Sequence, residues 1–205
     1  GVLRTRVGYC GGDKEKPNYY SLGDQTEAIT IDYDPEVLSY DEMLNFFWNG
    51  HRCDQINRSR QYMNAVFYRN EEQRKIGEAS LVKEAARRGI SAAEVQTKIL
   101  PMKTFTYAEG YHQKYYLTRF SDVRGFLNEA YPDAKSLADS TVATRLNAYL
   151  GSGMGLDWEI FLKELPKYGL SEELETPLAQ AAKRQINCGV GLYKKSRTPR
   201  ALGGV

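Results

Sequence analysis

Glu27 is the first candidate for acid–base chemistry, because it opens a strand-like stretch whose alternate residues are apolar. The pattern over residues 27–33 places Glu27 on one face with Ile29 and Ile31. Burial at the edge of an apolar face raises the pKa of a carboxyl group and lets it hold a proton near neutral pH. Such a group suits a general acid. The alternative is a strand-end glutamate that faces water.

Three tyrosines, Tyr19, Tyr20 and Tyr62, stand near predicted junctions between loops and strands. A phenol in such a place can donate a hydrogen bond to a developing oxyanion. The chain has 15 tyrosines, so packing is the competing role for each. His51 follows an aromatic helical stretch and suits either a base or a helix C-terminus. His112 lies among tyrosines, which favours a packed residue over a metal ligand.

The three cysteines, Cys10, Cys53 and Cys188, are far apart and form no CxxC pair. This arrangement argues against a disulfide scaffold and a Cys-rich zinc site, and it favours a reducing compartment, with the cytoplasm as the expected location. Cys10 sits in a glycine-flanked turn, as either a packed or an activated thiol. Cys188 precedes a basic segment, which is the profile of a resolving cysteine or of an incidental thiol.

Composition indicates a soluble globular protein, with 205 residues, 41% hydrophobic and 26% charged. No apolar run approaches the roughly 18 residues of a membrane span. No alternation of basic and aromatic residues marks a nucleic-acid surface. Residues 183–205 hold six Lys or Arg and no acid, which fits either a solvated tail or a strip for an acidic partner surface.

The elements that must position these residues follow from local signals. Ser39 with Glu42, and Asn70 with Gln73, are capping boxes that open two helices. The order of elements predicts an α+β fold, a mixed or antiparallel sheet with helices packed on it, followed by a C-terminal helical appendage. The predicted strands are 2–9, 27–33, 62–68 and 95–100, residues 105–120 are helical or irregular, and the later helices are 137–150, 157–168 and 171–187.

Several short motifs stand in a specific order and spacing between Gly1 and about Leu117. They are Val7-Gly8-Tyr9-Cys10-Gly11-Gly12, Pro17-Asn18-Tyr19, Glu27-Ala28, Tyr33-Asp34-Pro35, Phe47-Trp48, His51, Gln61-Tyr62, Ala108-Glu109 and Tyr111-His112-Gln113. With these motifs the chain resembles the peptide methionine sulfoxide reductase A family, whose core is ferredoxin-like. The resemblance implies a reductase-like domain over 1–120, and the residue pattern predicts a helical extension over 121–182 and a basic flexible tail over 183–205.

The resemblance implies roles for four residues. Glu27 matches the acid that protonates the sulfoxide oxygen, Tyr62 and Tyr19 match the tyrosines that hydrogen-bond that oxygen, and Tyr20 is the fallback for Tyr19. The nucleophile is the cysteine of a Gly-Cys-Phe-Trp-Gly motif expected upstream of Gly1, outside this chain. Its attack yields a sulfenic acid, a second thiol such as Cys188 condenses with it, and thioredoxin restores the enzyme without a bound cofactor or metal.

Three departures from the family pattern concern residues near the site. The histidine that usually lies two residues before the acid is Gln25 here. The usual loop with an active-site aspartate is shortened to a stretch that contains Asp54 and Asn57. The acidic residue that usually follows Glu109 is Gly110. These changes put catalytic efficiency in doubt, although Glu27 is retained.

Two functions therefore remain open from the sequence. The first is a thioredoxin-linked reduction of methionine S-sulfoxide in oxidised peptides or proteins, a repair reaction under oxidative stress, by a protein whose nucleophile lies outside this chain. The chain alone is then expected to be inactive. The alternative is a catalytically inactive reductase-like domain that acts as an interaction or structural component of a larger assembly.

Overall fold

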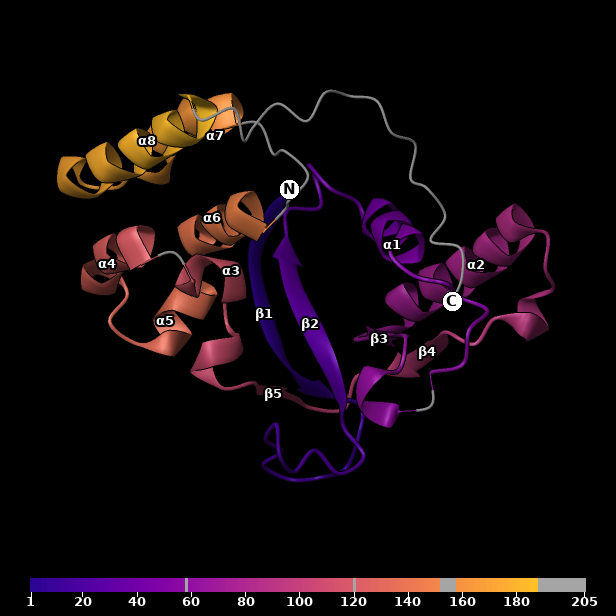
Figure 1. Cartoon of the computed structure of the whole chain (residues 1–205). Coiled ribbons are helices and arrows are strands. Elements are labelled where there is room, and N and C mark those ends of the chain that lie inside the picture. The colour runs from indigo at the N-terminus through magenta and orange to yellow at the C-terminus, as the bar shows by residue number, and fades with distance from the viewer. Residues whose placement is uncertain (58, 120, 152–157, 188–205) are drawn as a thin grey trace. The chain divides into compact units, whose positions relative to one another are not determined.

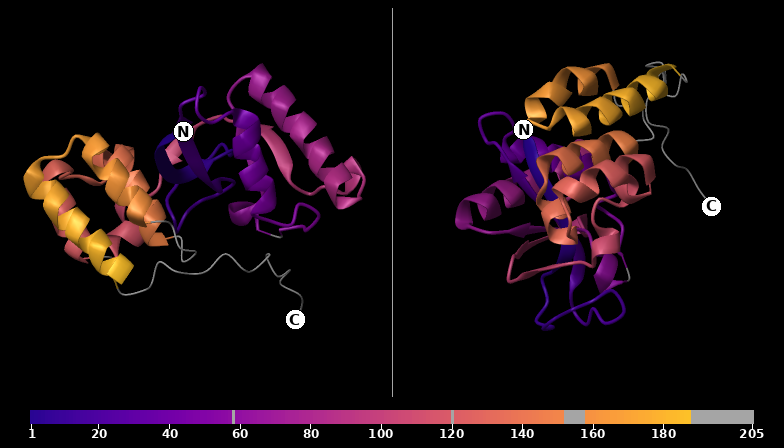
Figure 2. Two further views of the ribbon diagram at one scale, coloured as in Figure 1. Left: turned by 90° about the horizontal axis from the view of Figure 1, so that it is seen from above. Right: turned by 90° about the vertical axis from the view of Figure 1, so that its left-hand side faces the viewer.

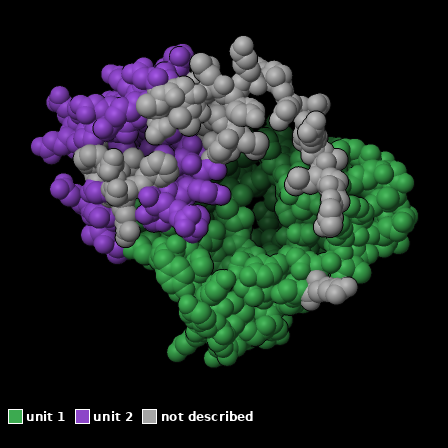
Figure 3. Space-filling view, in the orientation of Figure 1, with its two compact units in different colours: residues 1–113, 134–141 green, residues 114–133, 142–205 purple. Residues whose placement is uncertain are grey.

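The computed structural model describes residues 1–57, 59–119, 121–151 and 158–187 (Figure 1). The chain divides into two compact units, one of residues 1–113 and 134–141, the other of residues 114–133 and 142–205 (Figure 3). No described helix is long and apolar enough to cross a membrane. The domain boundaries at 120 and 182 stay predictions, and most of the basic tail lies outside the described residues.

An antiparallel sheet of three strands begins the first unit. β1 (Val2–Cys10) lies in the middle, between β2 (Thr26–Tyr33) and β5 (Phe105–Tyr107). The two long strands confirm the sequence prediction, each one residue longer than expected. Their register places Tyr9 opposite Glu27, so the two side chains leave the same face of the sheet.

A second sheet pairs β3 (Ala65–Tyr68) with β4 (Lys98–Pro101) in parallel. Parallel neighbours need a crossover, which α2 (Glu71–Arg88) provides by packing on both strands, with α1 (Tyr40–Asn49) at its side (Figures 1 and 2). Together they confirm the predicted α+β class. The buried core of this half consists of Leu44, Trp48, Cys53, Val66, Ala85 and Val95.

Both helices begin where the capping signals predict. The Ser39 hydroxyl accepts a hydrogen bond from the Glu42 N–H (3.2 Å), and the Glu42 carboxylate accepts one from the Ser39 N–H (2.9 Å). This is a complete capping box. The Asn70 side chain accepts from the Gln73 N–H at 2.8 Å, but the Gln73 side chain accepts from Arg69. In the second box, the Gln73 side chain therefore accepts from the residue before the N-cap and not from the N-cap residue Asn70 itself.

Three segments differ from the prediction because distant partners decide them. Tyr62 lies in a 3-10 turn, Arg60–Tyr62, and not in the strand that follows it. Strand β5 forms inside the segment predicted as helical or irregular, because its backbone pairs with β1. Strand β4 begins at Lys98, three residues later than predicted. Two further 3-10 turns span Ala92–Glu94 and Gly110–His112.

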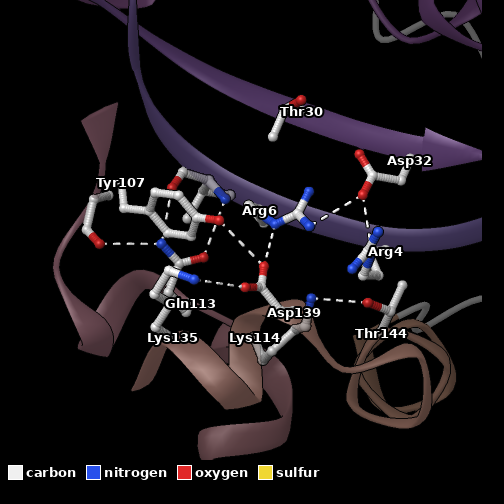
Figure 4. Close-up of polar contacts among 12 residues, drawn as sticks. Arg4, Arg6, Thr30, Asp32, Tyr107, Gln113, Lys114, Lys135, Asp139 and Thr144 are labelled. Atoms are coloured by element: carbon white, nitrogen blue, oxygen red, sulfur yellow. Dashed lines mark hydrogen bonds and ion pairs between the residues drawn. The ribbon is translucent and has the colours of Figure 1, made fainter. Parts of the chain in front are cut away.

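Gln113 lengthens the edge of the first sheet with a side chain in place of a strand. Its Oε1 accepts from the Val7 N–H at 3.1 Å, and its Nε2 donates to the Val7 carbonyl at 2.8 Å and to the Ala108 carbonyl at 3.1 Å (Figure 4). The amide thus completes the ladder of β1 where β5 ends. These hydrogen bonds explain structurally why a glutamine stands at position 113 of the motif.

An ion network fastens α5 (Ala134–Asp139) to the first sheet (Figure 4). Arg6 of β1 donates to Asp139 and, at 3.0 Å, to Asp32 of β2, while the Tyr107 hydroxyl donates to Asp139 at 3.2 Å. Burial by itself raises the pKa of Asp139, but the hydrogen bond from Arg6 opposes it, and with its other partners lowers that pKa to about 2. Helix α5 is therefore held to the first unit by Arg6 of β1, which is itself paired with Asp32 of β2.

The second unit is helical. Helix α8 (Glu172–Asn187) packs against α7 (Trp158–Glu164) and α4 (Ser121–Ala130). Their buried side chains include Phe161, Leu165 and Leu178. The predicted helix 171–187 is confirmed, with its start at Glu172. The predicted helix 137–150 is divided between α5 and α6 (Thr141–Gly151), the predicted helix 157–168 is α7 followed by a 3-10 turn, and α4 was not predicted. The elements are α3 (Tyr115–Thr118), α4 (Ser121–Ala130), α6 (Thr141–Gly151), α7 (Trp158–Glu164), a 3-10 turn (Leu165–Tyr168) and α8 (Glu172–Asn187).

Candidate active site

Glu27, Gln61 and Tyr62 meet where β2 begins beside the 3-10 turn. The Gln61 Nε2 donates to the Glu27 Oε1 at 2.7 Å and to the Tyr62 hydroxyl at 3.1 Å. One amide thus bridges two residues that the sequence predicted for the site. Gln61 itself was not predicted to act there, since its only signal was its place in the family motif next to Tyr62.

The predicted desolvation of Glu27 is wrong for this structure. Its side chain is exposed, and Ile29 on the same strand face is 56% exposed. The alternation of β2 is as predicted, but among the described residues none covers this end of the strand face. The role of Glu27 as an acid stays a prediction, and it requires a cover that these residues do not provide.

Tyr19 completes the cluster by lying against Tyr62. The Tyr19 phenol is the main reason why the pKa of Tyr62 is raised. The fallback residue, Tyr20, is 90% exposed and meets the Tyr19 ring edge-on, with centroids 5.6 Å apart. The geometry therefore favours Tyr19 over Tyr20 as the second phenol.

The turn after β1 is built around Gln25, which stands where the family's histidine is expected. Its buried Oε1 accepts from the Gly12 N–H at 3.0 Å, and its Nε2 donates to the Lys14 carbonyl at 3.0 Å. Gly11 has a φ of 88°, and a Cβ there would lie 2.3 Å from the Phe67 ring. Gln25 thus performs a structural task that fixes the approach to β2.

The shortened loop before Tyr62 supports its backbone. The Asn57 Nδ2 donates to the Tyr62 carbonyl at 2.5 Å. The Asp54 carboxylate accepts from Arg52 at 2.8 Å, and this hydrogen bond lowers the pKa of Asp54. Asp54 is thus held as an anion by an arginine of its own loop.

An apolar cavity of about 470 Å³ opens beside the cluster, between β2 on one side and α1 and β3 on the other. Figure 3 shows the first unit hollowed at this place. Its polar lining residues include Glu27, Gln61 and Tyr62, together with Thr30, Asn64, Arg69 and Gln73. The apolar side chains that line it are Ile29, Ile31, Met43, Leu44, Phe47, Met63, Val66, Phe67, Met102 and Phe105.

Both histidines have structural surroundings. The His51 Nδ1 lies 2.9 Å from the Phe47 carbonyl, and its Nε2 lies 2.8 Å from the Thr97 hydroxyl. Burial lowers the pKa of His51, so the ring ties the end of α1 to the segment before β4 as a neutral group. The His112 ring packs against Tyr19, with centroids 5.0 Å apart.

The described cysteines are poor nucleophiles. Cys10 is buried and lines the cavity, and burial raises the pKa of its thiol. Cys53 is fully buried in the core. Cys188, the predicted resolving cysteine, lies outside the described residues. No group of metal-binding side chains gathers in the described part of the chain.

Residues 1–137 match the family model described as peptide methionine sulfoxide reductase. The chain belongs to this family. A peptide methionine sulfoxide reductase of Drosophila melanogaster is 41% identical over 172 residues, which cover 83% of this chain and 67% of the relative. The A5 reductase of Arabidopsis thaliana is 32% identical over 154 residues, covering 73% of this chain and 59% of that protein.

The solved structure of a reductase-family protein has a similar fold. The crystal structure of Mxr1 from Saccharomyces cerevisiae in reduced form aligns with a TM-score of 0.53 and 25% identity, over 58% of this chain and 72% of that one. The curated relatives are longer than the matched part, since the chain spans 67% of the Drosophila reductase and 59% of the Arabidopsis one. Family membership and fold thus agree with the motifs from which the site was predicted.

Proposed function

We propose that this chain forms the substrate-binding and proton-donating side of a peptide methionine S-sulfoxide reductase, whose nucleophilic cysteine lies outside residues 1–205. The observation that carries the proposal is the hydrogen-bonded cluster of Glu27, Gln61, Tyr62 and Tyr19 beside an apolar cavity. A sulfoxide needs donors for its oxygen and an apolar surface for its methyl group. The cluster offers the donors, and the Phe-Trp of the upstream motif is expected to supply the apolar surface.

The residues divide the reaction between them. The phenols of Tyr62 and Tyr19 donate hydrogen bonds to the sulfoxide oxygen, and Glu27 gives that oxygen a proton while a cysteine thiolate attacks the sulfur. The oxygen passes to the cysteine, which becomes a sulfenic acid as the sulfoxide is reduced to methionine. A second thiol then displaces water to form a disulfide, and a dithiol protein of the thioredoxin type reduces it.

The described cysteines and the free sheet edges support the proposed place of the nucleophile. Cys10 and Cys53 are buried, and Cys188 is proposed as the second thiol. The outer edges of β2 and β3 have no strand partner in the described residues, and the cavity is lined from both strands. A segment seated there would bring a thiol to the cluster and would cover Glu27 from solvent.

The proposed partners follow from this chemistry. Oxidised-methionine peptides or proteins are the substrates, and thioredoxin is the reductant, in a reducing compartment such as the cytoplasm. The basic residues 183–205 suit an acidic partner surface. No bound cofactor takes part in the reaction.

The test compares the natural full-length protein with the 205-residue chain. Each is incubated with thioredoxin, its reductase and a peptide that carries either the S or the R epimer of methionine sulfoxide. We expect the full-length protein to reduce the S epimer, the R epimer to serve as the matched control, and the short chain to be inactive. A full-length protein that reduces neither epimer would overturn the proposal and leave the alternative, a non-catalytic reductase-like domain.

A further inference from the structure

Glu109 joins two parts of the first unit that are far apart in sequence. Its Oε2 accepts a hydrogen bond from the Tyr9 hydroxyl at 2.7 Å, and its Oε1 accepts one from the Tyr19 backbone N–H at 3.0 Å. Glu109 follows β5 and precedes the 3-10 turn at Gly110. Both oxygens of one carboxylate are thus directed at the site, one at its sheet and one at its loop.

The first arm of this bridge is rigid. Tyr9 is 2% exposed, packs with Leu22 and Ala108, and stands opposite Glu27 in the register of β1 and β2. The strand residue that faces the proposed acid therefore also anchors Glu109. A buried phenol on a central strand has little freedom, so the Glu109 carboxylate is fixed relative to Glu27.

The second arm holds the loop that carries Tyr19. Asn18 and Ser21 close the turn on each other, through N–H···O contacts of 3.0 and 3.4 Å, and Leu22 anchors its far end in the core. The Tyr20 N–H donates to the Asn18 side chain at 3.0 Å, and the Tyr19 ring packs on His112. The bond to Glu109 ties the Tyr19 backbone to the segment that follows β5. The Tyr19 phenol, which lies against Tyr62, moves with that backbone.

We propose that Glu109 is a positioning residue that places the Tyr19 phenol against Tyr62 for the sulfoxide oxygen. The inference rests on the proposed function and names a residue that does not itself touch the substrate. A carboxylate suits the task because it is an acceptor at both oxygens, and the two groups that face it are both donors. A glutamine in its place has the same size but only one acceptor oxygen. It can bond to both the Tyr9 hydroxyl and the Tyr19 N–H only if the Tyr9 hydroxyl rotates and accepts a hydrogen bond instead of donating one.

Electrostatics support a charged Glu109. Burial pushes the pKa of its carboxyl upward, but the hydrogen bonds from Tyr9 and from the Tyr19 N–H outweigh burial, and the pKa lies below its ordinary value. The carboxylate is therefore ionised at neutral pH. Hydrogen bonds to a charged acceptor are stronger and more directional than neutral ones, which is what a fixed loop position requires.

The first experiment needs no enzymatic activity. In the 205-residue chain with 13C-labelled tyrosine, NMR titration gives the pKa of Tyr62 in wild type, Glu109→Ala, Glu109→Gln and Glu42→Ala. We expect Glu109→Ala to return the Tyr62 pKa toward its ordinary value and Glu109→Gln to do so in part. Glu42→Ala removes a capping acid far from Tyr62 in sequence and controls for lost stability, leaving the Tyr62 titration unchanged.

The second experiment uses the full-length protein and the S-sulfoxide peptide. Because removal of an oxyanion donor costs roughly 10²–10³-fold in kcat, displacement of Tyr19 by Glu109→Ala should cost about tenfold in kcat, with a smaller change in KM and partial recovery in Glu109→Gln. If Glu109→Ala fails to fold, Tyr9→Phe removes the phenol contact alone and is measured in its place.

The two experiments separate the two proposals. A Tyr62 titration that is the same in wild type and in Glu109→Ala overturns the positioning role, whatever the activity. A full-length protein without activity overturns the proposed function, and a shifted Tyr62 titration in Glu109→Ala then still supports the positional link. Equal losses of kcat in Glu109→Ala and Glu42→Ala would mark Glu109 as a contributor to stability and not to position.

Discussion

Two carboxylates of the first unit, Glu27 and Glu84, are held in opposite ways. Glu84 is buried, and both of its oxygens accept from guanidinium groups, at 2.7 and 2.8 Å from Arg87 and at 2.5 Å from Arg88. Glu27 is exposed and accepts from the neutral amide of Gln61 at 2.7 Å. Glu84 is therefore paired with cations, whereas Glu27 is oriented by a neutral hydrogen-bond donor.

The difference fits different tasks for the two carboxylates. The hydrogen bond from Arg87 is the main cause that lowers the pKa of Glu84, and Arg88 also donates to the carbonyls of Trp48 and His51, at 3.1 and 3.0 Å. Glu84 thereby orients a cation that caps the end of α1. A group that must exchange a proton cannot be paired in this way, and Glu27 meets that condition.

The largest effect is expected for Glu27→Gln in the full-length protein. Loss of a general acid costs roughly 10²–10⁴-fold in rate, measured as kcat/KM on an S-sulfoxide peptide. Because Glu27 is exposed, the free energy of unfolding should change by no more than about 0.5 kcal/mol. Glu36→Gln, an exposed acid in the turn after β2, is the matched control. Wild-type rates in Glu27→Gln would remove it from the acid role.

Glu84→Gln should show the opposite result, a large loss of stability with unchanged activity. The variant loses its charge-assisted bonds and leaves Arg88 without its anion, so urea unfolding should show a loss of about 1–3 kcal/mol. The kcat of the folded full-length protein should stay at the wild-type value. Glu78→Gln, an exposed partner of Arg74, should lose less than about 0.5 kcal/mol. An equally small loss in Glu84→Gln would mean that burial adds nothing to this ion cluster.

The same comparison shows how far the sequence could predict the molecule. Strand β2 and the cap at Ser39 depend on neighbours within a few residues, so alternation and capping signals were sufficient. Strand β5 depends on pairing with β1, about a hundred residues earlier. The desolvation of Glu27 was predicted from its own strand face, yet burial depends on what covers that face. The bridging role of Gln61 arises only when β2 and the 3-10 turn meet.

The smallest effect concerns His51, which lies beside the Glu84 cluster. Burial lowers the pKa of His51, the Phe47 carbonyl raises it, and the charges of Arg88 and Glu84 act in opposite directions, with a net lowering. The unfolded histidine, with a pKa near 6.5, therefore binds a proton at a pH where the folded one does not. The contribution of His51 to stability is complete above about pH 6.5 and is lost as the pH falls below it.

The corresponding measurement is urea unfolding of wild type and His51→Asn between pH 5 and 7.5. The difference between their free energies of unfolding should shrink as the pH falls below about 6.5, with a slope of at most about 1.4 kcal/mol per pH unit for one group. Subtraction of one curve from the other removes the pH dependence that carboxylates cause, because they titrate in both proteins. A difference that stays constant with pH would mean that His51 titrates alike in the folded and unfolded chains, and that the buried cluster does not hold its imidazole neutral.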